Sequence, residues 1–107
     1  MRILLDECID RRFAHEFPDL EVHTVPQMGW AGVKNGELMK LAEVDFDVFI
    51  TVDRNLSYQQ NLPRYAIALI VLQAVSNRYV DLKPFADQVK ASLPNAKAGI
   101  VSVISLN

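Results

Sequence analysis

The feature of this chain that most constrains its fold is an alternation between short apolar runs and segments with helical spacing. Five runs rich in strand-forming residues cover 2–5, 21–25, 47–52, 66–72 and 99–105. The third and fourth runs are almost entirely apolar, as strands are when both faces of their sheet are covered. We therefore expect an α/β protein, in which a mostly parallel five-stranded sheet forms the middle layer of a three-layer α/β/α sandwich.

The segments between these runs carry apolar residues at the period of a helix. The spacing predicts helices over 10–17, 36–43 and 80–92, and a shorter one over 56–60. Asn35 is expected to be the N-cap of the second helix. The side chains expected to face the core are Leu38, Leu41 and Ala42 in that helix, and Leu82, Phe85, Ala86, Val89 and Leu93 at the last one.

Length and composition favour one self-sufficient domain over residues 1–107. Half of the 107 residues are apolar, and the net charge of −2 leaves no overall basic surface, so a nucleic acid would have to bind a local patch. Cys8 is the only cysteine, which excludes an intrachain disulfide and fits a reducing compartment. The longest apolar run, 65–72, is too short to span a bilayer. We expect a cytoplasmic protein that does not contact a membrane.

Acidic residues follow two of the predicted core strands. Asp6 and Glu7 come directly after the first strand, and Asp53 follows the third. Because the carboxyl ends of parallel strands meet at one edge of a sheet, these acids should be neighbours, and Glu37 at the start of the second helix could join them. Grouped carboxylates repel one another and attract a hard cation such as Mg²⁺ or Mn²⁺. The sequence predicts catalytic acids at all four positions, with Asp6, Glu37 and Asp53 as metal ligands.

Each acid also has a purely structural explanation. Asp6 and Glu7 could cap the first helix, and Glu37 lies in a first helical turn, where the helix dipole favours a negative charge. Asp53 could stabilise a turn through its side chain. The predicted joint position of the acids at one sheet edge favours a functional site.

Three short blocks of the sequence resemble the compact branch of the PIN-domain-like nucleases, many of which are predicted toxins of toxin–antitoxin pairs. The blocks are Leu4-Leu5-Asp6-Glu7, the segment 35–42 and Thr51-Val52-Asp53-Arg54-Asn55-Leu56. The resemblance implies a PIN-like fold and a metal-dependent ribonuclease that cuts single-stranded RNA to leave a 3′-hydroxyl and a 5′-phosphate. It also implies an antitoxin partner.

By position, Asp6 resembles the first metal-binding acid of that family, and Asp53 resembles the acid of its Thr-x-Asp motif. Asn35 and Asn55 stand where relatives commonly have aspartate. An asparagine oxygen can contact a metal but brings no charge, so Glu7 or Glu37 would have to supply it. The residues expected to bind substrate at this edge are Lys34, Asn35, Arg54, Asn55 and Arg78.

Two other functions fit parts of the pattern. A response-regulator receiver domain has an acidic pair after its first strand and a phosphoacceptor aspartate after its third. Receivers also need a hydroxyl after the fourth strand and a lysine after the fifth, and the residues here are Gln73-Ala74 and Ser105. A PIN-like binding module that no longer cuts is the second alternative, because of Asn35 and Asn55. A homodimer through Trp30, Val33 and Met39 is a further expectation.

Overall fold

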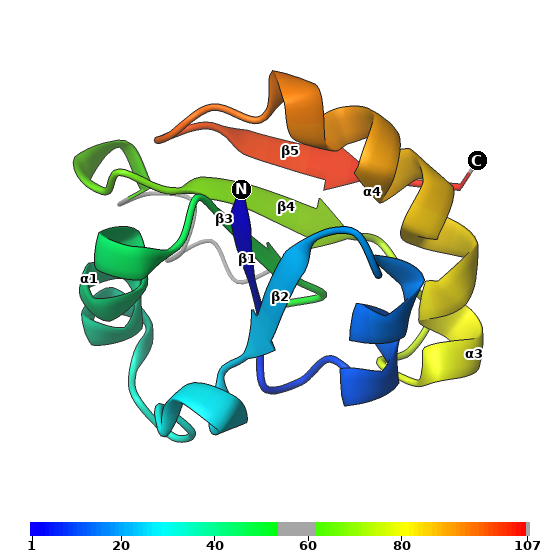
Figure 1. The fold of residues 1–107 in the computed structure, drawn as a ribbon, viewed down its shortest axis with the longest axis horizontal. Helices are drawn as coiled ribbons and strands as arrows, with labels where there is room; N and C mark the ends of the chain where they lie inside the picture. The colour runs from blue at the N-terminus through cyan, green and yellow to red at the C-terminus, as the bar shows by residue number, and fades with distance from the viewer. Residues whose placement is uncertain (54–61, 107) are drawn as a thin grey trace.

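The computed structural model of the chain describes residues 1–53 and 62–106. Its strands are β1 (Arg2–Leu5), β2 (Glu21–Thr24), β3 (Val48–Thr51), β4 (Ala68–Leu72) and β5 (Val101–Ile104). They form one sheet in the order β2-β1-β3-β4-β5, and every neighbouring pair is parallel (Figure 1). The α/β class and the five strands agree with the expectation, although the sheet is entirely parallel rather than mostly parallel.

The described helices are α1 (Asn35–Asp45), α3 (Tyr79–Leu82) and α4 (Ala86–Ser92). Shorter 3-10 turns are η1 (Arg11–Glu16), η2 (Pro26–Met28), η3 (Leu62–Arg64), η4 (Lys83–Phe85) and η5 (Leu93–Asn95). The single helix expected over 80–92 is thus α3, η4 and α4 in succession, because Pro84 lacks the N–H that a continuous α-helix needs. The helix expected over 56–60 lies outside the described residues.

Both faces of the sheet are covered, which explains why every residue of β4 is buried. Successive strand side chains point to opposite faces. Ile3 and Leu5 of β1 pack with Phe13 of η1 and with buried side chains of α3 and α4, whereas Leu4 packs with α1. Figure 1 shows the same division, with α1 on one side of the sheet and α3 and α4 on the other. The five residues expected to face the core from the last helical region are all buried.

Two expectations for α1 are wrong. Leu41 is 37% exposed, whereas Met39 is only 2% exposed, because the buried face of α1 follows Leu38, Met39, Ala42 and Phe46. The helix also begins at Asn35, so Lys34 rather than Asn35 occupies the N-cap position. The backbone N–H of Leu38 donates to the carbonyl of Lys34 (2.8 Å), which closes the first turn one residue earlier than predicted.

The surface expected to form a homodimer is also wrong in part. Met39 is buried in the core, and Trp30 and Val33 pack against the same core cluster. The Trp30 ring meets Phe46 edge to face, with 6.1 Å between the ring centroids. None of the helices in the described part of the chain is long and apolar enough to cross a membrane.

Candidate functional site

The strand order places a topological switch point between β1 and β3. The chain runs from β1 to β2 on one side and then returns to β3 on the other side of β1. In parallel α/β sheets, ligands bind beyond the carboxyl ends of the strands at such a point. Asp6 follows β1 directly, and Asp53 lies two residues after Thr51, the last residue of β3. The two acids with the strongest sequence argument therefore occupy the expected place.

Asp6 is buried and held by its neighbours. Asp6 is only 5% exposed, and its backbone N–H donates to the carbonyl of Ile50 in β3 (3.0 Å). Carboxylate atom Oδ1 accepts the backbone N–H of Glu7 (2.8 Å), and Oδ2 accepts the hydroxyl of Thr51 (2.7 Å). These contacts fix the orientation of the carboxylate before any ligand binds.

Thr51 connects Asp6 to Asp53. The hydroxyl of Thr51 donates to Asp6 and accepts the backbone N–H of Asp53 (2.9 Å). Cys8 completes the cluster, because its Sγ donates to Oδ2 of Asp6 (3.5 Å) and lies 3.9 Å from the Thr51 hydroxyl. The cluster formed by Asp6, Cys8, Thr51 and Asp53 is called the β1/β3 site below.

Burial changes the acid–base properties of the β1/β3 site. Removal from water raises the pKa of Asp6, the three hydrogen bonds to its carboxylate oppose that rise, and the negative charge of Asp53 adds to it. Burial and the charge of Asp6 also raise the pKa of the Cys8 thiol to about 11. No cationic side chain within the described ranges forms an ion pair with Asp6. The ionised carboxylate therefore lacks a compensating charge from this part of the protein.

Glu7 ties a neighbouring loop to the β1/β3 site. Glu7 is exposed, and its Oε1 atom accepts the backbone N–H of Gly32 (3.3 Å). Gly32 has a φ of 82°, a left-handed conformation that glycine adopts without strain. The same loop leads to Lys34, which is exposed just before α1. Glu7 thus holds a loop with a basic residue near the site.

The structure does not gather the three predicted metal ligands into one group. Among the described residues, no three side chains of His, Cys, Asp and Glu are placed to hold a metal ion together. Glu37 is exposed in the first turn of α1. Asp6 and Asp53 still fit a weakly held Mg²⁺ or Mn²⁺, because Mg²⁺ keeps several waters and commonly takes only one or two carboxylates. A site of this kind would use the second lone pair of Oδ1 in Asp6, which accepts one hydrogen bond from the described part of the chain.

The residues expected to bind substrate have different positions. Lys34 is exposed, and Arg78 is exposed between β4 and α3, where its guanidinium lies 3.4 Å from the Asp81 carboxylate. The side chain of Asn35 and both Arg54 and Asn55 lie outside what the structure describes. The described candidates therefore comprise one loop lysine beside Glu7 and one arginine engaged with a neighbouring acid.

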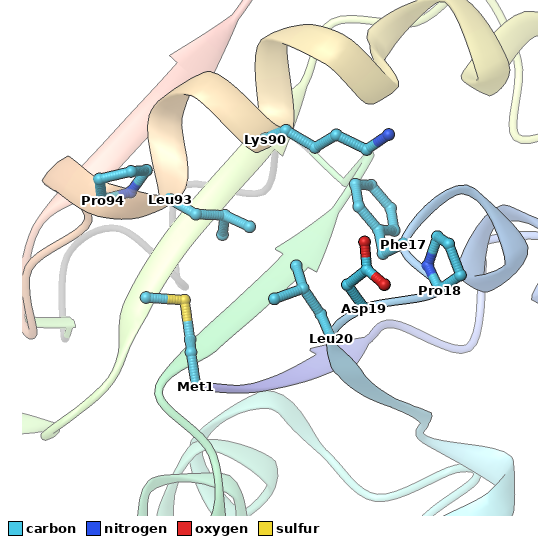
Figure 2. Close-up of a pocket in the computed structure, with 8 residues that line it drawn as sticks. All are labelled: Met1, Phe17, Pro18, Asp19, Leu20, Lys90, Leu93 and Pro94. Carbon is cyan, nitrogen blue, oxygen red and sulfur yellow. The ribbon is translucent and has the colours of Figure 1, made fainter.

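An apolar pocket lies at the amino-terminal ends of the strands, away from the β1/β3 site. It has a volume of about 460 Å³, and Figure 2 shows Met1, Leu20 and Leu93 facing a common space, with Lys90 and Asp19 on either side of the Phe17 ring. Met1 and Leu20 immediately precede β1 and β2, so the pocket is at the amino ends of these strands. Its mainly apolar walls do not suit a phosphodiester, and it contains none of the acids of the β1/β3 site.

The sequence pattern assigned no role in the site to Thr51 or to Cys8. Thr51 was visible as a hydroxyl near the end of an apolar strand, two residues before Asp53. Its contact with Asp6 depends on the pairing of β1 with β3, in which Leu5 is opposite Ile50. The position of Cys8 against the same carboxylate had no signal in the sequence.

We compared the chain with protein-family models, with curated proteins and with solved structures, and found no match in any of the three.

Proposed function

We propose that this protein is a metal-dependent endoribonuclease with a PIN-like fold that hydrolyses single-stranded RNA. The observation that carries the proposal is the buried carboxylate of Asp6, fixed by Thr51 and adjacent to Asp53 at the switch point of a parallel sheet. Asp6 forms no ion pair with a cationic side chain within residues 1–53 and 62–106, and a buried carboxylate in such surroundings takes up a proton or binds a cation. The resemblance of three sequence blocks to PIN-like nucleases favours the cation.

The residues of the β1/β3 site would divide the work between them. Asp6 and Asp53 would hold Mg²⁺ or Mn²⁺, and Thr51 keeps the Asp6 carboxylate in its orientation. An ion bound there would supply positive charge for the phosphate and would lower the pKa of water. Lys34 offers a contact for the RNA backbone, and Glu7 positions the loop that carries it. Glu37 acts at longer range, as an exposed negative charge on α1.

The cellular role follows from the same resemblance. We propose a cytoplasmic toxin that is neutralised by an antitoxin. The acids of the β1/β3 site, Asp6 and Asp53, together with the neighbouring Glu7, favour an antitoxin segment with basic residues that occupy the place of the metal and the RNA. Addition of the antitoxin should then compete with Mn²⁺ for the same acids.

The decisive experiment is a cleavage assay on mixed single-stranded RNA with Mn²⁺. The wild-type protein should produce fragments with 5′-phosphates, and Asp53→Asn should not. Asp19→Asn is the matched control, because Asp19 is an exposed aspartate near the amino-terminal ends of the strands, away from the β1/β3 site. Absence of cleavage, together with no effect of Mn²⁺ on the melting temperature, would contradict the proposal.

Two outcomes identify the alternatives. A melting temperature that rises with Mn²⁺ without RNA cleavage would indicate a binding module that no longer cuts. Stable phosphorylation of Asp53 by a small phosphodonor would indicate a receiver-like domain, whose strand order is the same as that of this sheet. The latter is disfavoured because β4 is followed by Gln73 and Ala74, and no lysine follows β5.

A further inference from the structure

The free edge of β5 has backbone groups available for another strand. Among the described residues, β5 pairs only with β4. Leu69 N–H donates to the carbonyl of Ile100 (3.1 Å), and Gln73 N–H donates to that of Ile104 (2.9 Å). Alternate residues of a parallel strand bond to the same neighbour. The N–H and C=O groups of Val101 and Val103 therefore point away from β4.

This edge also lacks the features that usually prevent strands from associating. Residues 98–106 contain no charged residue and no proline. Ile100, Val103 and Leu106 are 54%, 51% and 47% exposed, respectively. Monomeric proteins commonly protect a sheet edge with charges, prolines or bulges, and an uncharged apolar edge favours association.

The opposite edge of the sheet, formed by β2, is charged. Arg2 Nε lies 3.3 Å from the carboxylate of Glu21, and His23 Nε2 lies 3.4 Å from the other oxygen of the same carboxylate. Pairing β5 of one copy with β2 of the next would desolvate these groups, so an open chain of molecules is disfavoured. Pairing of β5 with β5 carries no such cost.

We propose that two copies of this chain associate through antiparallel pairing of their β5 strands about a two-fold axis. In this arrangement Val101 of each copy is opposite Val103 of the other, and the outward N–H and C=O groups of both residues form hydrogen bonds. Both valine side chains lie on the α1 face of the sheet, since they are opposite Leu69 and Val71. The segment has no charges that would repel one another across the axis.

The association should be weak and reversible. One strand pair with a few apolar side chains buries less than a standard interface of about 1,600 Å². We therefore expect a dimer that dissociates on dilution. The proposal is independent of the nuclease activity, because β5 contains no residue of the β1/β3 site.

The test is sedimentation equilibrium of the wild-type chain over about a hundredfold range of concentration, beside two lysine variants. Val103→Lys should shift the equilibrium to monomer by at least about tenfold in the dissociation constant, because each lysine would face Val101 of the other copy and the two lysines would be diagonal neighbours of like charge across the axis. Val44→Lys is the control: Val44 is 79% exposed on α1, away from β5, and its variant should dimerise as the wild type does. A wild-type chain that is monomeric throughout would overturn the proposal.

A second variant separates association from folding. The N–H of Val103 points to the free edge, so Val103→Pro removes a donor needed by the partner and none used by β4. It should abolish the dimer while the circular dichroism spectrum is retained. Amide exchange of the wild-type protein provides a readout without mutation: the Val101 and Val103 amides should exchange more slowly as concentration rises. Dimers or longer assemblies with unchanged exchange at both amides would refute pairing through β5.

Discussion

The hydroxyl of Thr51 donates a 2.7 Å hydrogen bond to the buried carboxylate of Asp6, although the two residues are 45 positions apart in the chain. The contact joins the ends of β1 and β3 at the switch point of the sheet. It gives the site one acid whose geometry is fixed and whose charge is disfavoured. Asp53, which contacts the same hydroxyl through its backbone, is exposed.

The first prediction concerns the effect of Asp6 on stability as a function of pH. The pKa of Asp6 is raised above the ordinary value of 3.8, so the folded protein holds this proton at pH values where the unfolded chain has lost it. The resulting stabilisation is complete below pH 3.8 and is lost as pH rises through the raised pKa. The free energy of unfolding of wild type minus that of Asp6→Asn should therefore fall over this window and then level off.

Urea unfolding of both proteins at several pH values measures this difference. Asp10 acts in the opposite sense, because its hydrogen bonds with Arg12 lower its pKa to about 2, and its contribution is lost as pH falls from 3.8 towards that value. Asp10 is present in both proteins, so its effect cancels in the difference. A difference that rises with pH would show that the carboxylate is favoured in its ionised form.

The second prediction is that the Thr51 hydroxyl matters because of the Asp6 charge. Thr51→Val leaves the buried carboxylate with one donor fewer and should destabilise the metal-free protein by about 1–3 kcal/mol at neutral pH. The same substitution should cost less in an Asp6→Asn background, which a double-mutant cycle detects. Thr51→Ser, which keeps the hydroxyl, is the control. Equal losses in both backgrounds would mean that Thr51 acts through packing or through its bond with the Asp53 backbone, and not through the Asp6 charge.

A third prediction concerns Cys8 in the metal-free protein. Burial and the charge of Asp6 raise the pKa of the thiol from 9.0 to about 11, so the thiolate fraction near neutral pH should be about a hundredfold smaller than in an unperturbed cysteine. Alkylation by iodoacetamide should accordingly be slow and should accelerate up to strongly alkaline pH. Asp6→Asn should speed the reaction at pH 8, because it removes the neighbouring charge. Rapid alkylation of the wild type at pH 7 would contradict the prediction.

The fourth prediction rests on the proposed function and compares two acids at the metal. Glu37 is not grouped with Asp6 and Asp53, so Glu37→Gln should weaken Mn²⁺ binding by only a few-fold, as the loss of a distant charge would. Asp53→Asn should weaken it by at least about tenfold, because a direct ligand is lost. Isothermal titration with Mn²⁺ distinguishes the two. Similar losses for both variants would mean that Glu37 reaches the ion.

The local pattern of the sequence predicted most of the sheet. The five strand segments agree with the structure to within a few residues at their ends, because β-branched and apolar runs bounded by polar joints leave little choice of structure. The buried residues of α4 and its neighbours were predicted because apolar residues recur there at the period of a helix. Leu41 and Met39 were assigned to the wrong sides of α1, because a helix with apolar residues at 38, 39, 41 and 42 has no single obvious buried face.

The site was predicted less completely than the sheet. Asp6 and Asp53 could be found because strand ends in a parallel sheet share an edge, and that rule needs only the strand boundaries. The expectation that Glu37 joins them depended on how α1 is placed against the sheet, which no local pattern specifies. The roles of Thr51 and Cys8 depended on the pairing of β1 with β3 and on the direction of individual side chains.

The sequence by itself determined the alternation of strands and helices, the identity of most core residues and the position of two acids at strand ends. These features follow from hydrophobic periodicity, which acts over a few neighbouring residues. Only the tertiary structure decided that β1 lies beside β3, that Asp6 is buried against Thr51, and that β5 is an uncharged edge strand of the sheet formed by the described residues. The physical reason is that burial and electrostatic environment depend on which distant segments pack together, and that choice minimises the free energy of the whole chain.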